Sequence, residues 1–176
     1  MIVLMAGLPG TGKTTLAREL ASRVGGRVVS KDQVRHALFL PDEIEYSTAQ
    51  DDFCLGIMLD LAGRLLERAP ERAIFFDGRP FSRRYQIDNV LHGAAELHQP
   101  WRILECVCSD KTAKGRLAGA SDHPARNRTA ALYDEVSARF EAILELQTVI
   151  DTEIPFEECI RAAMAALGQD AAVYNR

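Results

Sequence analysis

Residues 7–14 of this chain read GLPGTGKT, and this stretch decides the fold. Gly7, Gly12, Lys13 and Thr14 occupy every fixed position of the pattern G-x-x-x-x-G-K-[ST]. A short apolar run precedes the stretch and an amphipathic helical pattern follows it. A strand before and a helix after are the context in which this pattern forms a phosphate-binding loop. The alternative, a glycine-rich turn formed by accident, is disfavoured by that context.

A loop of this composition can cradle the phosphates of a nucleotide. Its glycines let the backbone N–H groups approach phosphate oxygens, and the positive end of the following helix faces the same anion. Lys13 supplies a positive charge for the β- and γ-phosphates, and Thr14 offers a hydroxyl to Mg²⁺. We therefore predict ATP and Mg²⁺ as ligands. The predicted nucleotide-binding residues are Gly7, Leu8, Pro9, Gly10, Thr11, Gly12, Lys13, Thr14 and Thr15.

Outward from the loop, short apolar runs alternate with helical patterns along the whole chain, which is typical of an α/β protein with a mostly parallel sheet. The predicted strands are Ile2–Ala6, Arg27–Ser30, Ala73–Phe76, Arg102–Cys108 and Thr148–Ile150. The predicted helices are Lys13–Val24, Asp32–Leu40, Thr48–Arg68, Ser82–Leu97, Lys111–Ala118, Thr129–Leu146 and Phe156–Leu167. We predict a P-loop NTPase fold with five strands flanked by helices. Residues 1–176 should form one domain.

Composition excludes several classes of protein. The net charge of −4 is a poor match for a non-specific nucleic-acid binder, which is usually basic. No apolar run is long enough to span a membrane, so we expect a cytoplasmic protein. Cys106 and Cys108 lie in an apolar run, which predicts buried strand residues. The four histidines, His36, His92, His98 and His123, show no metal-binding spacing.

A candidate catalytic pair follows the second predicted strand. Asp32 can accept the proton of an attacking hydroxyl, and Arg35, one helical turn later, can bind an anionic group or tune the carboxylate. The alternative is that Asp32 only caps the helix or stabilises its first turn.

A second candidate carboxylate ends the third strand. Asp77 has the position of a Walker-B acid, so we predict that it binds the metal together with Thr14. The alternative is a turn formed by Asp77 and Gly78. No glutamate follows Asp77.

Basic residues form two further candidate groups. Residues 109–128 are predicted to form a basic lid in which Arg116 and Arg128 neutralise phosphate charge. A solvated basic surface is the alternative for this segment. Arg79, Arg83 and Arg84 follow Asp77, and they could meet an acidic substrate or simply decorate the start of a helix.

Taken together, GLPGTGKTT, SKDQVR, FFDGR and the Arg-Leu pair at Arg116 resemble the small zeta-toxin-like and polynucleotide-kinase-like P-loop kinases, ATP-binding kinases with an AAA domain. That group includes sugar, antibiotic and nucleic-acid 5′-hydroxyl kinases. The resemblance implies that Asp32 is the general base and that Arg35 positions the substrate. It also implies lid arginines at Arg116 and at Arg126 or Arg128. Family lids often carry a second arginine four residues after the first, where this chain has Ala120.

The predicted function is therefore transfer of the γ-phosphate of ATP to a hydroxyl of a small molecule such as a sugar, antibiotic or nucleoside. A polynucleotide 5′-hydroxyl kinase is one alternative, which the acidic net charge disfavours. A non-transferring ATPase or nucleotide switch is another. The chain lacks the N-K-x-D motif of a GTPase and the glutamate that an AAA motor carries after its Walker-B acid. A nucleotide-binding regulator without turnover is a third alternative.

Overall fold

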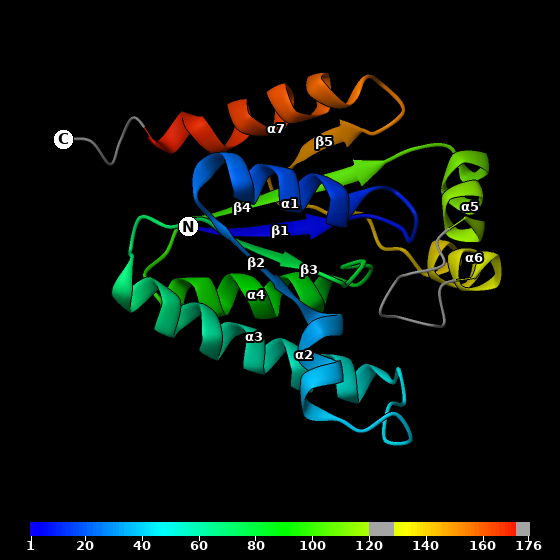
Figure 1. Ribbon diagram of the computed structural model, residues 1–176, viewed down its shortest axis with the longest axis horizontal. Helices are drawn as coiled ribbons and strands as arrows, with labels where there is room; N and C mark the ends of the chain where they lie inside the picture. Colours follow the sequence, from blue (N-terminus) through cyan, green and yellow to red (C-terminus); the bar gives the residue numbers. More distant parts are fainter. Residues whose placement is uncertain (120–128, 172–176) are drawn as a thin grey trace.

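The computed structural model describes residues 1–119 and 129–171, which form a five-stranded sheet between two layers of helices (Figure 1). Every strand pair is parallel, and the strand order is β2-β3-β1-β4-β5. The strands are β1 (Ile2–Ala6), β2 (Arg27–Ser30), β3 (Ile74–Asp77), β4 (Trp101–Val107) and β5 (Thr148–Asp151). The predicted α/β class and the parallel five-stranded sheet are confirmed.

The central strand β1 shows why the sheet needs helices on both faces. All five of its residues are fully buried, which a strand covered on both faces requires. Successive side chains of a strand point to opposite faces. Ile2 and Leu4 accordingly join one hydrophobic cluster, while Val3 and Met5 join the other.

Two helices cover each face of the sheet (Figure 1). The cluster around Leu4 is completed by α3 (Thr48–Arg68) and α4 (Arg84–Glu96). The cluster around Met5 is completed by α1 (Lys13–Val24) and α7 (Phe156–Ala171). The remaining helices, α2 (Lys31–Leu38), α5 (Asp110–Ala118) and α6 (Ala130–Ala138), lie near the carboxyl ends of the strands. The elements that carry chemistry therefore gather at that edge.

The prediction of a single helix over Thr129–Leu146 is wrong in its second half. Helix α6 ends at Ala138, and an irregular segment leads from there to β5. Tertiary contacts explain the difference, because the backbone N–H of Glu141 donates to Ser82 O at 2.9 Å. The Glu141 carboxylate accepts from the Arg84 backbone N–H at 2.8 Å. Contacts made by Glu141 thus override the helical pattern of the sequence.

The helix predicted over Ser82–Leu97 begins later than expected, and contacts of Glu141 are again involved. Ser82 does not cap it, since α4 begins at Arg84 and its first N–H groups meet Glu141 and Gln86. The helix predicted over Asp32–Leu40 also ends earlier, at Leu38. Cys106 is buried in β4 as predicted, but Cys108 is only partly buried and lies beyond the strand. In the described ranges, none of the helices has the length and apolar character needed to cross a membrane.

Candidate active site

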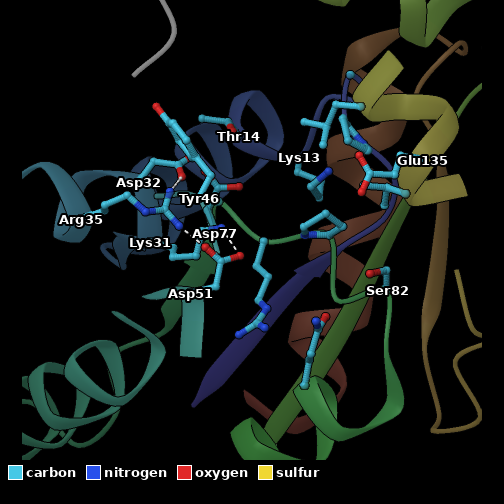
Figure 2. A pocket seen from close by; sticks show the side chains of 18 of the residues that line it. Lys13, Thr14, Lys31, Asp32, Arg35, Tyr46, Asp51, Asp77, Ser82 and Glu135 are labelled. Atoms are coloured by element: carbon cyan, nitrogen blue, oxygen red, sulfur yellow. Dashed lines mark hydrogen bonds and ion pairs between the residues drawn. The ribbon is translucent and has the colours of Figure 1, made fainter. Parts of the chain in front are cut away.

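A cavity of about 940 Å³ opens where β1, β2 and β3 end (Figure 2). Five of the predicted catalytic residues line it: Lys13, Asp32, Arg35, Asp77 and Arg116. The sixth, Arg128, lies outside the described residues, as do Arg126, Ala120 and His123. The fold therefore brings together residues from four separate parts of the sequence.

The glycine-rich loop leaves β1 in a conformation that only glycine tolerates. Gly7 has φ +122° and Gly10 has φ +82°. A Cβ at Gly7 would collide with the carbonyl oxygen of Cys106, and one at Gly10 would collide with that of Ala113. The loop is thus packed against β4 and α5 at its backbone.

Most of the predicted nucleotide-binding positions face the cavity. Its lining includes Pro9, Gly10, Gly12, Lys13, Thr14 and Thr15. The side chain of Leu8 instead packs against a small cluster of Ala113, Leu117 and Tyr133. Lys13 Nζ donates to Gly7 O at 2.8 Å and to Leu8 O at 2.6 Å, which places its charge inside the curve of the loop.

Asp77, the last residue of β3, faces the same space. Its side chain is buried, and Oδ1 has no hydrogen-bond partner among the described residues. Thr14, the other predicted metal ligand, also lines the cavity. An unpartnered buried carboxylate oxygen and a threonine hydroxyl in one cavity suit Mg²⁺, which keeps several waters and takes further ligands from phosphates. No group of three or more His, Cys, Asp or Glu residues in the described part could hold a metal by itself.

The candidate base lies in a buried ion-pair network (Figure 2). Arg35 Nη1 donates to Asp32 Oδ1 at 3.0 Å, and Arg35 Nη2 pairs with Asp51 Oδ1. Lys31 Nζ donates to Asp51 Oδ2 at 2.7 Å. Asp32 lies in the first turn of α2, but its carboxylate meets Arg35 and the cavity rather than capping the helix.

This network is nearly closed to water. Arg35 is only 1% exposed, and the ring of Tyr46 covers its guanidinium at 5.0 Å. Tyr46 has φ +53°, an uncommon conformation for a residue with a side chain. Burial lowers the pKa of Lys31, and the nearby Asp51 carboxylate opposes that shift. The positions of Asp32 and Arg35 are thus fixed from several sides.

The predicted lid arginine is tied to the loop after β5. Arg116 Nη1 donates to Thr152 Oγ1 at 2.8 Å, and Nη2 donates to Thr152 O at 2.8 Å. The Thr152 hydroxyl in turn donates to Thr11 O in the phosphate loop at 3.0 Å. Lys114, another cation of the segment, pairs with Asp134 at 2.6 Å instead. Arg116 therefore lies at the edge of the cavity, next to the phosphate loop.

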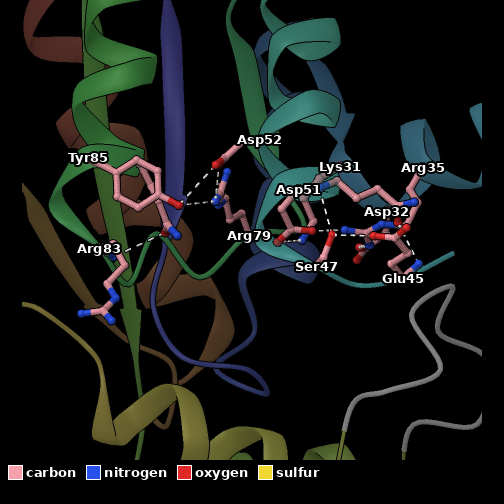
Figure 3. A network of polar contacts seen from close by, with 12 residues as sticks. Lys31, Asp32, Arg35, Glu45, Ser47, Asp51, Asp52, Arg79, Arg83 and Tyr85 are labelled. Atoms are coloured by element: carbon pink, nitrogen blue, oxygen red, sulfur yellow. Dashed lines mark hydrogen bonds and ion pairs between the residues drawn. The ribbon is translucent and has the colours of Figure 1, made fainter.

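Arg79, Arg83 and Arg84, the second basic group of the sequence, differ in their surroundings. Arg79 and Arg83 line the cavity, whereas Arg84 does not. Arg83 also forms an exposed ion pair with Glu141 at 2.7 Å. Arg79 is buried and pairs with Asp52 of α3 (Figure 3).

Sequence reasoning missed the acidic start of α3. Asp51 and Asp52 read as ordinary acids in the first turn of a helix, where they favour its positive end. Their partners Lys31, Arg35 and Arg79 come from other elements, so only the fold reveals the pairing. The only sequence feature that draws attention to Lys31 is its place next to Asp32 in the Ser-Lys-Asp run after β2.

The cavity is basic although the chain is acidic. Eight basic and four acidic side chains of the described residues line it. The basic ones are Lys13, Arg18, Lys31, Arg35, Arg79, Arg83, Arg116 and Arg139, and the acidic ones are Asp32, Asp51, Asp77 and Glu135. Such an excess attracts anionic ligands such as nucleotides.

The sheet order and the glycine-rich loop define a P-loop NTPase fold. The chain belongs to the AAA_33 family of AAA domains, whose model matches residues 2–143. No curated protein matches the sequence.

Solved structures share the fold at low sequence identity. A gluconokinase from Sinorhizobium meliloti 1021 is 18% identical, with a TM-score of 0.64 over 99% of this chain and 97% of that one. The APS kinase CysC of Mycobacterium tuberculosis, in complex with AMPPNP and APS, is 15% identical, with a TM-score of 0.71 over 95% and 96%. Kti12 from Chaetomium thermophilum, in complex with ADP-AlF3, is 12% identical, with a TM-score of 0.66 over 94% and 98%.

Proposed function

We propose that this protein is an ATP-dependent phosphotransferase that moves the γ-phosphate of ATP to a hydroxyl of a small molecule. One observation carries the proposal: the buried, arginine-bound carboxylate of Asp32 lines the same cavity as Lys13 of the phosphate loop. A P-loop that only hydrolyses ATP needs no second carboxylate on an acceptor wall. A kinase needs one to receive the hydroxyl proton.

In this proposal the phosphate loop holds the nucleotide. Backbone N–H groups of residues 7–15 and the amine of Lys13 bind the phosphates. Thr14 and Asp77 hold Mg²⁺, which when bound neutralises phosphate charge. Arg116 adds a cation at the rim of the cavity, and Arg128 remains a proposed second one. Residues 109–128 are proposed to act as a lid over the phosphates within one kinase domain of residues 1–176.

Asp32 is proposed to act as the general base. It accepts the proton of the acceptor hydroxyl while the oxygen attacks the γ-phosphorus in line, and the bond to the bridging oxygen of ADP breaks. Arg35 holds the carboxylate in place through its 3.0 Å contact. Asp51 fixes Arg35, and Lys31 in turn fixes Asp51. Little reorganisation is therefore needed during transfer.

A small acceptor fits the space better than a polymer. The cavity has to hold the nucleotide phosphates as well, and its volume falls within the range of small-molecule sites. The similar gluconokinase and APS kinase are named for small acceptors, which supports the same class here. The resemblance to zeta-toxin-like and polynucleotide-kinase-like enzymes remains part of the proposal, and the polynucleotide acceptor is an outcome of its test.

The test is transfer of label from γ-labelled ATP in the presence of Mg²⁺. Wild-type protein, Asp32→Asn and the exposed control Asp42→Asn are each offered a metabolite extract and, separately, a 5′-hydroxyl oligonucleotide. We expect label on an organic acceptor of the extract with wild type and Asp42→Asn, but not with Asp32→Asn. Label on the oligonucleotide would identify the polynucleotide kinase instead. Label released only as free phosphate by all three proteins would contradict a kinase.

A further inference from the structure

Arg79 is a buried arginine with unused donors on the acceptor side of the cavity. It follows Asp77 and Gly78 at the end of β3 and is 2% exposed. Its Nη2 lies 2.6 Å from Asp52 Oδ1 and 3.4 Å from the Tyr85 hydroxyl. Figure 3 shows its guanidinium beside Asp52 and Tyr85.

The rest of the guanidinium has no protein partner in the described part of the chain. Both Nε and Nη1 of Arg79 are buried without a hydrogen bond. These two atoms carry most of the N–H groups of an arginine. A buried donor left unpaired destabilises the folded state, and a charged one does so most strongly. A residue kept only for structure would be expected to use these groups.

The neighbouring cations are neutralised more completely. Arg35 uses Nη1 for Asp32 and Nη2 for Asp51, and Lys31 shares Asp51. Arg83 pairs with Glu141 in an exposed position. Asp52 Oδ1, which is buried, meets only Nη2 of Arg79 and leaves the other two nitrogens of the guanidinium without an acceptor. Arg79 therefore keeps the largest capacity for a further anion on this wall.

We propose that Arg79 binds an anionic group of the acceptor, a carboxylate, phosphate or sulfate carried on the same molecule as the reacting hydroxyl. This inference rests on the proposed function and narrows its substrate class. Oxygen anions match arginine donors with short, charge-assisted hydrogen bonds, which a neutral hydroxyl cannot equal. Asp52 and Tyr85 position the guanidinium, and Asp32 lines the same cavity to receive the hydroxyl.

The first test observes the guanidinium directly and needs no turnover. Protein saturated with Mg²⁺ and a non-hydrolysable ATP analogue, which fills the phosphate loop, is titrated with inorganic sulfate. ¹H–¹⁵N spectra follow the Nε–H signal of Arg79, assigned by its loss in Arg79→Lys. We expect a saturable shift of this signal and none of the Arg84 signal. An unchanged Arg79 signal would mean that no anion reaches these donors, and the inference would be overturned.

The second test concerns the acceptor itself. A metabolite extract is separated on a strong anion-exchange resin at neutral pH, and the retained and unretained fractions are offered with γ-labelled ATP. We expect transfer to the retained fraction. Arg79→Lys keeps the charge beside Asp52 and should raise KM for that acceptor by about 10- to 100-fold with kcat nearly unchanged. Arg84→Gln, outside the cavity, should change neither constant.

The outcomes separate the two proposals. Transfer confined to the unretained fraction overturns the anionic acceptor and leaves the kinase intact. Transfer to the retained fraction with equal KM in Arg79→Lys and wild type also overturns the role of Arg79. Absence of transfer to both fractions counts against the kinase, and the sulfate titration then decides by itself whether Arg79 binds an anion.

Discussion

Arg35 of α2 and Asp51 of α3 form a buried ion pair that joins the two helices beside the candidate base. Arg35 also holds Asp32, so the position of the base depends on Asp51, which lies sixteen places after Arg35 in the chain. This link explains how a short helix after β2 keeps a fixed orientation. It also predicts that substitutions in α3 affect the candidate base without contacting the acceptor.

Replacement of Asp51 tests that link. Asp51→Asn removes the charge that Lys31 and Arg35 share, so Lys31 loses its carboxylate partner and Arg35 keeps only Asp32. We expect the free energy of unfolding to fall by about 3 kcal/mol, the lower end of the range for breaking a buried ion pair. Urea unfolding measures the loss, with the exposed Asp60→Asn of the same helix as control. Equal stability of the two variants would show that the network contributes nothing.

Replacement of Asp32 separates binding from transfer. Asp32→Asn keeps the shape of the side chain but cannot take the hydroxyl proton. We expect nucleotide affinity close to wild type and a transfer rate lower by roughly 10²–10⁴-fold, the usual contribution of a general base. Single-turnover transfer and equilibrium binding of a fluorescent ATP analogue give the two numbers. A variant that transfers phosphate at the normal rate would remove Asp32 from the mechanism.

Replacement of Lys13 tests the phosphate loop. Lys13→Ala removes the positive charge next to Gly7 O and Leu8 O, and with it the proposed contact to the β- and γ-phosphates. We expect weaker binding of the fluorescent ATP analogue and loss of turnover. Arg161→Ala, an exposed cation of α7 that does not line the cavity, is the control. Wild-type turnover in Lys13→Ala would contradict the proposed loop.

Glu153 gives a test that depends on pH. Hydrogen bonds from Thr112 and then Ser109 lower the pKa of its carboxyl below the usual 4.5. A carboxylate with a lowered folded pKa stabilises the fold above its unfolded pKa, and this contribution is lost as the pH falls through the folded value. Glu153→Gln should therefore melt below wild type at pH 7, and the gap should close in acid as the pH falls through the folded pKa.

Melting temperatures of both proteins between neutral and acidic pH measure this effect. Glu67→Gln, exposed on α3, is the control. A gap between wild type and Glu153→Gln that stays constant over the whole pH range would show that the lost hydrogen bonds, and not the charge, set the difference.

The sequence alone predicts the fold well because its strongest signals are local. The loop of residues 7–14 and the apolar runs around it depend on neighbours in the chain, and β1, β3 and β4 lie close to where the pattern puts them. The error in Thr129–Leu146 has a distant cause. Contacts of Glu141 with Ser82 and Arg84, more than fifty residues away, decide the path of that segment.

The site was only partly predictable for the same reason. Lys13, Asp32 and Asp77 lie at the ends of strands or shortly after them, so the rule that ligands bind at the carboxyl ends of parallel strands brings them together. Asp51 and Arg79 gain their meaning from partners on other elements. No pattern in the chain marks an acid in a helix start as the partner of a buried cation.

The two walls of the cavity are built from different parts of the fold. The phosphate wall, formed by the glycine-rich loop and Asp77, lies at the ends of β1 and β3. The side chains of these two strands form the centre of both hydrophobic clusters. The acceptor wall consists of helix starts and loops, and side chains such as Tyr46 and Arg79 belong to neither cluster. A chain organised in this way can evolve a new acceptor preference without rebuilding its hydrophobic clusters, so relatives with this fold need not share a substrate.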